Sequence, residues 1–173
     1  MSIALGAASC TAEDTPRYNA TDVHFLGMMV PHHEQAIEMS DILLDSPDAD
    51  PQVRDLAQRI RDGQARENDQ MRTWADEWGE HEAMEFHSQH IANGMVMPDE
   101  LEALKTLRGD ELETQFLELM HIHHADVIAM TQGEVDEGEY APLQEMAEDM
   151  IEVQTAEMGE MEDMLGFVPR PAA

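Results

Sequence analysis

The chain has 173 residues, a length typical of one domain with a sizeable core. Its 38 acidic residues outnumber its 9 lysines and arginines, so the formal net charge is −29. This charge excludes ordinary nucleic-acid binding and docking to anionic membranes, because both need clustered cations. The unusual residue types are methionine, with 15 copies, and histidine, with 9.

Residues 1–20 are expected to be a disordered tail or the remnant of a lipoprotein signal. Cys10 is the only cysteine, which excludes a disulfide framework and cysteine-based zinc sites. Small residues precede it, as at a bacterial lipid-attachment site, and the sequence leaves a lipid anchor and a plain tail both open. No stretch reaches the ~18 consecutive apolar residues of a membrane-spanning helix.

The first two predicted helices form a hairpin over residues 21–78. Thr21 or Asp22 can cap the first helix, and Pro31 is expected to kink it because proline removes a backbone donor. A turn follows. Asp50 can cap the second helix, and Pro51 occupies the first helical position, where proline is favoured.

Residues 79–109 are predicted to be a long crossover that contains a short helix near 98–107. The segment is rich in histidine and methionine. It is either a second, exposed surface that collects metal ions or a polar loop that happens to be histidine-rich. The residues concerned are His81, His87, His90, Met95 and Met97.

The last two predicted helices form a second hairpin over residues 110–166. Asp110 can cap the third helix, which is expected to end near Gly138. Pro142 is expected to open the fourth helix. Residues 167–173 form a C-terminal tail.

The second hairpin repeats the first. Residues 25–39 (FLGMMVPHHEQAIEM) match residues 116–130 (FLELMHIHHADVIAM), and the pattern Gln-x-x-Glu-x-x-x-Met begins at Gln64 and again at Gln154. A helical hairpin used twice predicts an all-α fold. We expect an antiparallel four-helix bundle over residues 21–166, with pseudo-two-fold symmetry and a long crossover.

The paired histidines are predicted to face the core. His32 and His33 fall on two adjacent apolar lines of the first helix, and His123 and His124 fall on the same lines in the copy. A single inward histidine is usually a satisfied core residue. The repeated pair, flanked by methionine in both copies, favours a metal site.

Two glutamates occupy equivalent core positions on the other helices, Glu67 on the second and Glu157 on the fourth. A desolvated carboxylate needs a partner, and either a histidine or a bound cation can serve. These glutamates therefore either bind a metal ion directly or accept hydrogen bonds that orient the histidines. The sequence leaves both roles open.

Methionine accompanies each histidine pair at helical spacing, three or four residues earlier. A methionine stripe alone is typical of core packing. Thioethers combined with imidazoles, however, select Cu(I) over hard ions such as Mg²⁺. The pairs that project together are Met28/His32, Met29/His32, Met29/His33, Met120/His123 and Met120/His124.

These motifs resemble the domain-of-unknown-function family 305, which includes CopM-like copper-binding proteins. The resemblance covers about residues 21–166 and rests on the doubled His-His block, the Gln-x-x-Glu-x-x-x-Met pattern and Gly94-Met95. It implies a ferritin-like helical bundle, a periplasmic or extracellular-surface location with or without a lipid anchor, and binding of copper or silver. The candidate ligands that match the family motif are Met28, Met29, His32, His33, Met39, Met120, His123, His124 and Met130.

Three functions compete at this point. The first, which the sequence favours, is a copper-sequestering protein without turnover. The second is a ferritin-like di-metal oxidase, which needs Glu-x-x-His on two helices. Glu118-x-x-His121 fits that pattern, but its counterpart is Gly27-x-x-Val30, which argues against it. The third is a structural bundle with a buried His/Glu network. The oligomeric state and any delivery partner are left open.

Overall fold

Helices account for all regular secondary structure in the part of the chain that the structure describes. The structure is a computed structural model that covers residues 17–82 and 95–170. Its helices are α1 (Ala20–Leu44), α2 (Pro51–Trp78), α4 (Pro98–Thr106), α5 (Gly109–Glu137) and α6 (Ala141–Leu165). The predicted all-α class is confirmed. None of the helices in these two ranges combines the length and the apolar character needed to cross a membrane.

A capping box starts α1 slightly earlier than predicted. The Asn19 side chain accepts hydrogen bonds from the backbone N–H groups of Thr21 and Asp22, at 2.6 and 3.2 Å. The Asp22 carboxylate in turn accepts the Asn19 N–H at 2.6 Å. The predicted cap at Thr21 or Asp22 is therefore wrong, because this reciprocal pair already satisfies the free donors of the first turn.

The other helix ends follow ordinary capping chemistry. Asp50 caps α2, as predicted, by accepting the Gln52 N–H at 2.7 Å. The helix ends at Trp78, and Gly79 caps it with a φ of 73°, the left-handed conformation that favours glycine. The predicted Asp110 cap of α5 is wrong. Arg108 holds the cap position, and Asp110 lies in the first turn, where its charge complements the helix dipole.

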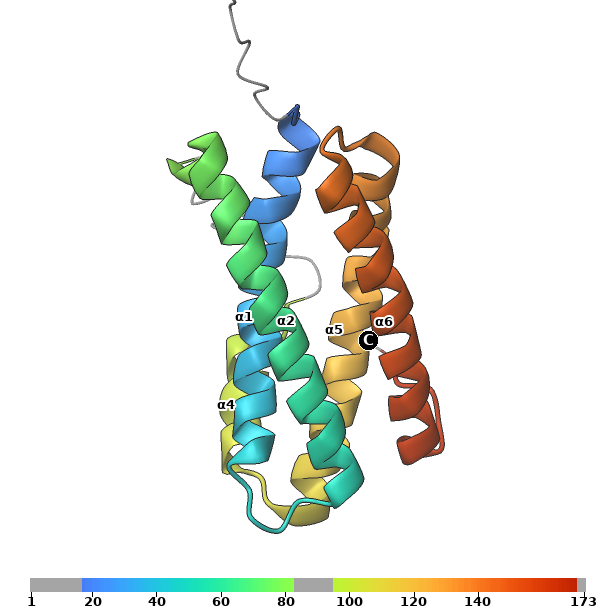
Figure 1. Cartoon of the computed structure of the whole chain (residues 1–173). Helices are drawn as coiled ribbons and strands as arrows, with labels where there is room; N and C mark the ends of the chain where they lie inside the picture. Colours follow the sequence, from blue (N-terminus) through green and yellow to red (C-terminus); the bar gives the residue numbers. More distant parts are fainter. Residues whose placement is uncertain (1–16, 83–94, 171–173) are drawn as a thin grey trace, which may run out of the picture.

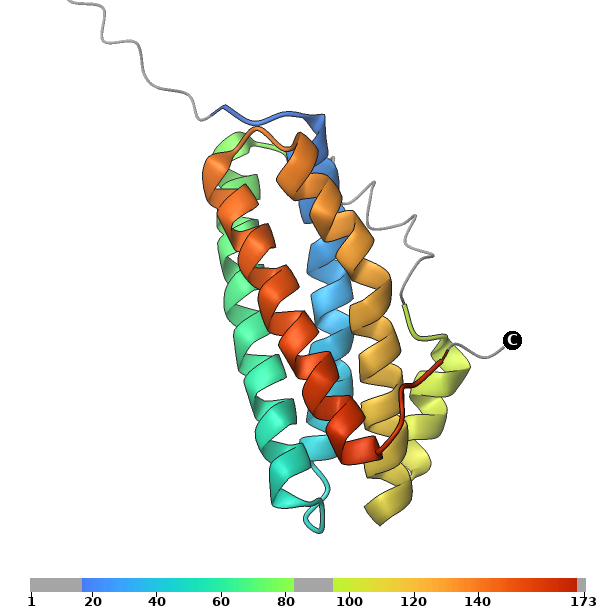
Figure 2. The same ribbon diagram turned by 90° about the vertical axis from the view of Figure 1, so that its right-hand side faces the viewer.

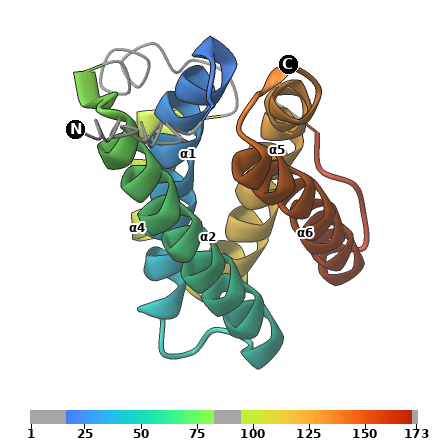
Figure 3. The same ribbon diagram turned by 45° about the horizontal axis from the view of Figure 1, so that its top comes forward.

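The four long helices lie side by side as two hairpins. α1 packs against α2, α5 packs against α6, and α1 packs against α5 (Figure 1). Following the chain in Figure 1, α1 descends, α2 ascends, α5 ascends and α6 descends. Figure 3, in which the top of the molecule comes forward, shows the two hairpins as separate pairs. α1 and α5 are consequently antiparallel, so equivalent residues of the two repeats meet near the midpoint of this contact.

The crossover is long because α2 ends at the top of the molecule and α5 begins at the bottom. Short α4 lies along the lower parts of α1 and α5 (Figure 2). Two contacts attach this region to α1. The Gln35 amide donates to the Val96 carbonyl at 3.0 Å and accepts the Val96 N–H at 2.7 Å. Lys105 Nζ pairs with Glu38 at 3.0 Å.

Two apolar clusters fill the interior. On α1 the change from one to the other falls between Val30 and Ala36, and on α5 it falls between Met120 and Val127. The paired histidines therefore separate them. The upper core consists of Val23, Phe25, Leu26, Met29, Val30, Met71, Trp74, Ala75, Trp78, Val127, Leu143, Ala147 and Met150. The lower core consists of Ala36, Met39, Leu43, Ala49, Val53, Leu56, Ala57, Ile60, Val96, Leu104, Leu112, Phe116, Leu117, Leu119, Met120 and Met161.

Buried carboxyl groups join the start of α1 to the α5–α6 turn. The fully buried Asp22 carboxylate accepts the backbone N–H groups of Glu139 and Tyr140, at 3.1 and 3.0 Å. Glu134 is buried beside it. Gly138 leaves the space that Glu134 fills, since a Cβ there would lie 2.3 Å from Glu134 Oε1. Burial, reinforced by Asp22, raises the pKa of Glu134 to about 8.

This raised pKa predicts a stabilising substitution. From pH 4.5, the ordinary value of the Glu134 carboxyl, to about 8, the unfolded chain ionises this group while the folded chain keeps its proton. Stability is therefore lost as pH rises through that window. Glu134→Gln should raise the free energy of unfolding by about 2 kcal/mol at pH 8 and change it little near pH 4.5, measured by urea denaturation. The exposed Glu137→Gln is the control. An equal effect of Glu134→Gln at both pH values would contradict the prediction.

Candidate metal centre

Four histidines form a buried layer between the upper and lower cores. His32 and His33 come from α1, and His123 and His124 come from α5. Each ring is at most 1% exposed. Neighbouring helical positions point about 100° apart. One histidine of each pair therefore faces the opposite hairpin while the other faces the partner helix of its own hairpin.

The inner pair, His32 and His123, stacks across the α1–α5 contact. The ring centroids lie 3.6 Å apart, and the ring planes differ by 26°. Neither nitrogen of either ring finds a hydrogen-bond partner of normal geometry within the described residues. Burial lowers the pKa of both imidazoles well below 6.5, and the neighbouring histidines add to the shift, so both rings are neutral at pH 7. Four unsatisfied ring nitrogens in an apolar interior are costly, and a bound metal ion is one group that could satisfy them.

The outer pair, His33 and His124, is held by glutamates. His33 Nε2 lies 2.8 Å from Glu67 Oε2, and His124 Nε2 lies 2.9 Å from Glu157 Oε2. A carboxylate only accepts, so each Nε2 donates, and in a neutral imidazole the lone pair is then on Nδ1. Both Nδ1 atoms are without a partner in residues 17–82 and 95–170. The carboxylates thus fix each outer ring in the tautomer whose Nδ1 can bind a metal ion.

The two glutamates differ in their access to water. The Glu67 side chain is 26% exposed, and the Glu157 side chain is 7% exposed. Periodicity predicted equivalent core positions for both, but Glu157 is buried and Glu67 is only half-buried. The two halves of the histidine layer are therefore unequally hydrated.

A third histidine–glutamate pair has no counterpart in the first repeat. His121 is buried, and its Nε2 lies 2.8 Å from Glu162 Oε1. Val30 holds the equivalent position on α1. Sequence reasoning left His121 out of the ligand set, although the run from His121 to His124 contains the signal. The pair places one more imidazole on the α5–α6 contact, next to His124.

Methionines from both repeats lie on each side of the histidine layer. Met29 belongs to the upper core, and the partly buried Met130 packs against that core. Met39 and Met120 belong to the lower core. Each side therefore has one methionine from α1 and one from α5, as the repeat and the antiparallel contact require. Met28 is only half-buried.

Three further buried methionines were left out of the predicted ligand set. Met71 and Met150 lie in the upper core, and Met161 lies in the lower core. Met71 and Met161 close the Gln-x-x-Glu-x-x-x-Met pattern of the two repeats, so their signal was present in the sequence. The three side chains add sulfur atoms to both sides of the histidine layer.

Among the residues that the structure describes, no three histidine, cysteine, aspartate or glutamate side chains converge as they would around a metal ion. A metal ion at the histidine layer would therefore need methionine sulfur, a rotation of the rings, or both. Sulfur together with imidazole is the donor combination that suits Cu(I).

The crossover residues lie apart from this layer. His81 is exposed and pairs with Asp76, Met97 is exposed and Met95 is half-buried. His87 and His90 lie outside the described residues, as does Cys10. The structure therefore does not describe a metal site shared by these crossover residues. The predicted second collecting surface stays a prediction.

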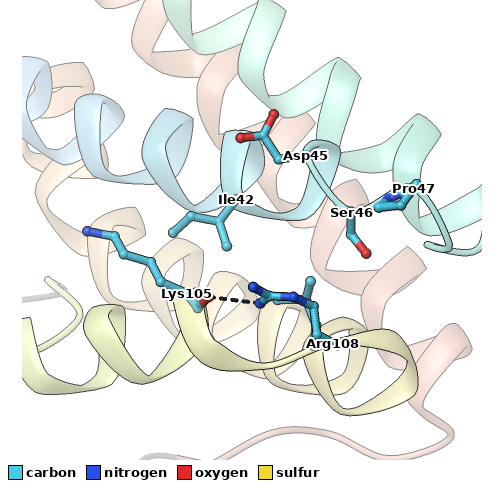
Figure 4. A pocket seen from close by; sticks show the side chains of 7 residues that line it. Ile42, Asp45, Ser46, Pro47, Lys105 and Arg108 are labelled. Carbon is cyan, nitrogen blue, oxygen red and sulfur yellow. Dashed lines mark hydrogen bonds between the residues drawn. The ribbon is translucent and has the colours of Figure 1, made fainter.

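A separate hollow of about 380 Å³ lies at the lower end of the molecule (Figure 4). Its two cations already have partners. Arg108 donates to the Lys105 carbonyl at 2.9 Å, and Lys105 Nζ pairs with Glu102 at 2.7 Å. None of the candidate metal ligands lines it. The lining residues are Ile42, Asp45, Ser46, Pro47, Lys105, Arg108 and Leu112.

Comparison with known proteins gives one family match. The family model described as "Domain of unknown function (DUF305)" matches residues 22–165. No curated protein sequence matches the chain.

Solved structures agree with the family match. A DUF305 protein from Streptomyces coelicolor that is assumed to be secreted is 31% identical, with a TM-score of 0.78, covering 88% of this chain and 98% of that one. A DUF305 fragment from Deinococcus radiodurans is 29% identical, with a TM-score of 0.76, covering 87% and 99%. CopM in its Cu(I)-bound form is 28% identical, with a TM-score of 0.70, covering 86% and 97%. CopM in its Cu(II)-bound form is 29% identical, with a TM-score of 0.71, covering 84% and 95%.

The buried inner histidines predict a specific pH dependence of stability in the metal-free protein. Below pH 6.5 the unfolded chain binds protons at His32 and His123, and the folded chain does not. Stability is therefore present above pH 6.5 and is lost as pH falls below it. Each histidine contributes up to about 1.4 kcal/mol per pH unit.

The measurement is urea denaturation at pH 7.5 and pH 5.5, on the wild type and on the His32→Leu/His123→Leu double variant. The double variant should lose less stability between these pH values than the wild type does. The exposed His81→Leu should behave like the wild type. A double variant with the full wild-type pH dependence would show that the inner rings take up protons in the folded state.

Proposed function

This chain belongs to the DUF305 family, and from that premise we propose that it is an extracytoplasmic copper-binding protein. It sequesters the ion, preferentially as Cu(I), through methionine sulfurs and histidine nitrogens. The single observation that carries the proposal is the stack of His32 on His123, whose four ring nitrogens are buried and without partners in the described part of the chain.

The scaffold of this function is a ferritin-like antiparallel four-helix bundle. It is one domain over residues 21–166, made of hairpins 21–78 and 110–166 and the crossover 79–109. The packing of α1 on α5 supports this arrangement, since it joins the two hairpins at their histidines. A bundle core is a suitable place for a metal site, because side chains from facing helices reach it without a loop.

The stack itself restricts where copper binds. The nitrogen lone pairs of an imidazole lie in the plane of its ring. An ion therefore binds at the ring edges and not between the two faces, which are 3.6 Å apart. Methionines lie above and below this layer, Met29 and Met130 on one side and Met39 and Met120 on the other. We assign one copper ion to each side, with imidazole and thioether ligands.

The outer histidines complete the site through their glutamates. Glu67 and Glu157 orient His33 and His124 and keep each Nδ1 free for the ion. In the bound state we propose for the carboxylates the second of the two roles left open by the sequence, which is to orient the histidines. Silver, whose monovalent ion is also soft, is a second cargo for the same donors. Met28 is an additional sulfur near the surface of α1.

The proposed location outside the cytoplasm has one support among the structural neighbours. The S. coelicolor protein is assumed to be secreted. A lipid anchor at Cys10 would hold the protein at a membrane surface. The net charge of −29 would then concentrate cations around the bundle wherever it is held.

The two alternatives predict different properties. A ferritin-like oxidase would consume oxygen when loaded with iron and supplied with a reductant. A structural His/Glu network would bind no copper. The oxidase lacks its paired motif, because Gly27 and Val30 stand on α1 where Glu118 and His121 stand on α5. We therefore assign binding without turnover.

Titration tests the proposal directly. Competition with a chromophoric Cu(I) chelator should show uptake with a Kd in the micromolar range or tighter, and a stoichiometry of two. His32→Ala and His123→Ala should each weaken binding about tenfold or more, because each removes one of the stacked imidazoles. His24→Ala, an exposed histidine on the same helix α1, is the matched control. Absence of uptake by the wild type would disprove the proposed function.

A further inference from the structure

A narrow cleft lies between α2 and α6, on the side of the histidine layer away from α4. Its volume is about 40 Å³, close to the space of one water molecule or one metal ion. In Figure 1 these two helices lie on the side of the bundle nearer the viewer, and α5 is visible behind the gap between them. The residues that line the cleft are Arg59, Ile60, Gly63, Gln64 and Glu67 of α2, and Met150, Val153, Gln154 and Glu157 of α6.

The lining of the cleft contains two buried amide side chains with unsatisfied hydrogen-bonding atoms. Gln64 and Gln154 are 4% and 3% exposed. Both amide atoms of Gln64 and the Oε1 atom of Gln154 are without a hydrogen-bond partner among the described residues. Buried amides normally have partners, so these two are suited to bind a polar or charged species that enters the cleft.

Hydrogen bonds connect the lining of the cleft to the outer histidines of the layer. The same cleft is lined by Glu67 and Glu157, the carboxylates that hold His33 and His124 at 2.8 and 2.9 Å. An ion at the inner end therefore meets amide and carboxylate oxygens directly beside the outer imidazoles.

The other end of the cleft reaches solvent. Val153 is 49% exposed, and Arg59, also exposed, pairs with Glu160 across the gap between α2 and α6. All four histidines of the layer are at most 1% exposed, so a copper ion needs a path to reach them. Among the long helices, α1–α2, α5–α6 and α1–α5 are the main packed pairs in the described residues, and α2–α6 is not one of them.

We propose that the cleft between α2 and α6 is the entrance through which a copper ion reaches the buried histidines. The oxygens of Gln64, Gln154 and the two glutamates replace part of the ion's hydration shell, one ion at a time. The ion then passes to the imidazole and thioether ligands. This inference rests on the proposed copper-binding function and adds the route to it.

Gly63 offers a way to close this entrance without touching a ligand. It lines the cleft, and a Cβ added there would meet no atom within 4 Å. The equivalent position of the second repeat is Val153, which already carries a side chain. Gly63→Leu would fill the free space. Gly159→Leu is the matched control, because it also meets no atom within 4 Å and lies on α6 outside the cleft lining.

The experiment measures Cu(I) uptake by stopped flow, with a chromophoric Cu(I)–chelator complex as the source, and the equilibrium affinity by titration. Gly63→Leu should slow uptake about tenfold and leave the affinity unchanged, because it narrows the route and spares the ligands. Gly159→Leu should match the wild type in both, although it gains the same helix propensity. Urea denaturation checks that both variants are folded.

The outcomes separate the entrance from the function. Uptake by Gly63→Leu at the wild-type rate overturns the entrance and leaves copper binding standing. Equal slowing by both leucine variants also overturns it, since the effect would then come from helix stiffness. Failure of the wild type to bind Cu(I) at equilibrium overturns the proposed function and, with it, the entrance.

Discussion

The central constraint on this structure is a pair of histidine rings in the core, at positions where a helical protein normally has an apolar side chain such as leucine. His32 and His123 stack in the middle of the molecule with four ring nitrogens that find no partner in the described residues. Apolar side chains at these positions would give a more stable core. The packing above and below the rings offsets this cost, because two continuous apolar clusters hold the helices together on either side.

The repeat turns this local arrangement into a symmetric one. Antiparallel packing of α1 on α5 brings equivalent histidines face to face and puts a methionine from each repeat on both sides of them. The symmetry is incomplete at the glutamates, since the Glu67 side chain is partly exposed and the Glu157 side chain is almost fully buried. It also fails at His121, whose counterpart on α1 is Val30. The two halves are therefore expected to bind their ions with different strength.

Much of this could be predicted from the sequence, because the repeat encodes it. Matching segments in two hairpins predicted the helices and which histidines face inward. The capping box at Asn19 could not be predicted from an acidic residue at Asp22 alone, because it depends on which of two neighbouring side chains reaches which N–H group. Periodicity also could not decide what Glu67 contacts, since a helical line places a residue on a face and does not select its partner.

The cleft between α2 and α6 could not be predicted from the sequence. Gln64 and Gln154 were visible as a repeated motif, but the free space beside Gly63 depends on how two helices that are not neighbours in sequence diverge. Tertiary packing determines the separation of α2 and α6, and no local sequence pattern encodes this separation.

The most direct measurement is an anomalous difference map, collected at the copper edge, from crystals of the protein loaded with Cu(I). Copper bound as proposed gives peaks beside the edges of the His32 and His123 rings, within bonding distance of methionine sulfur. Peaks confined to surface carboxylates, with the two rings still stacked and no density beside them, would contradict the proposed site.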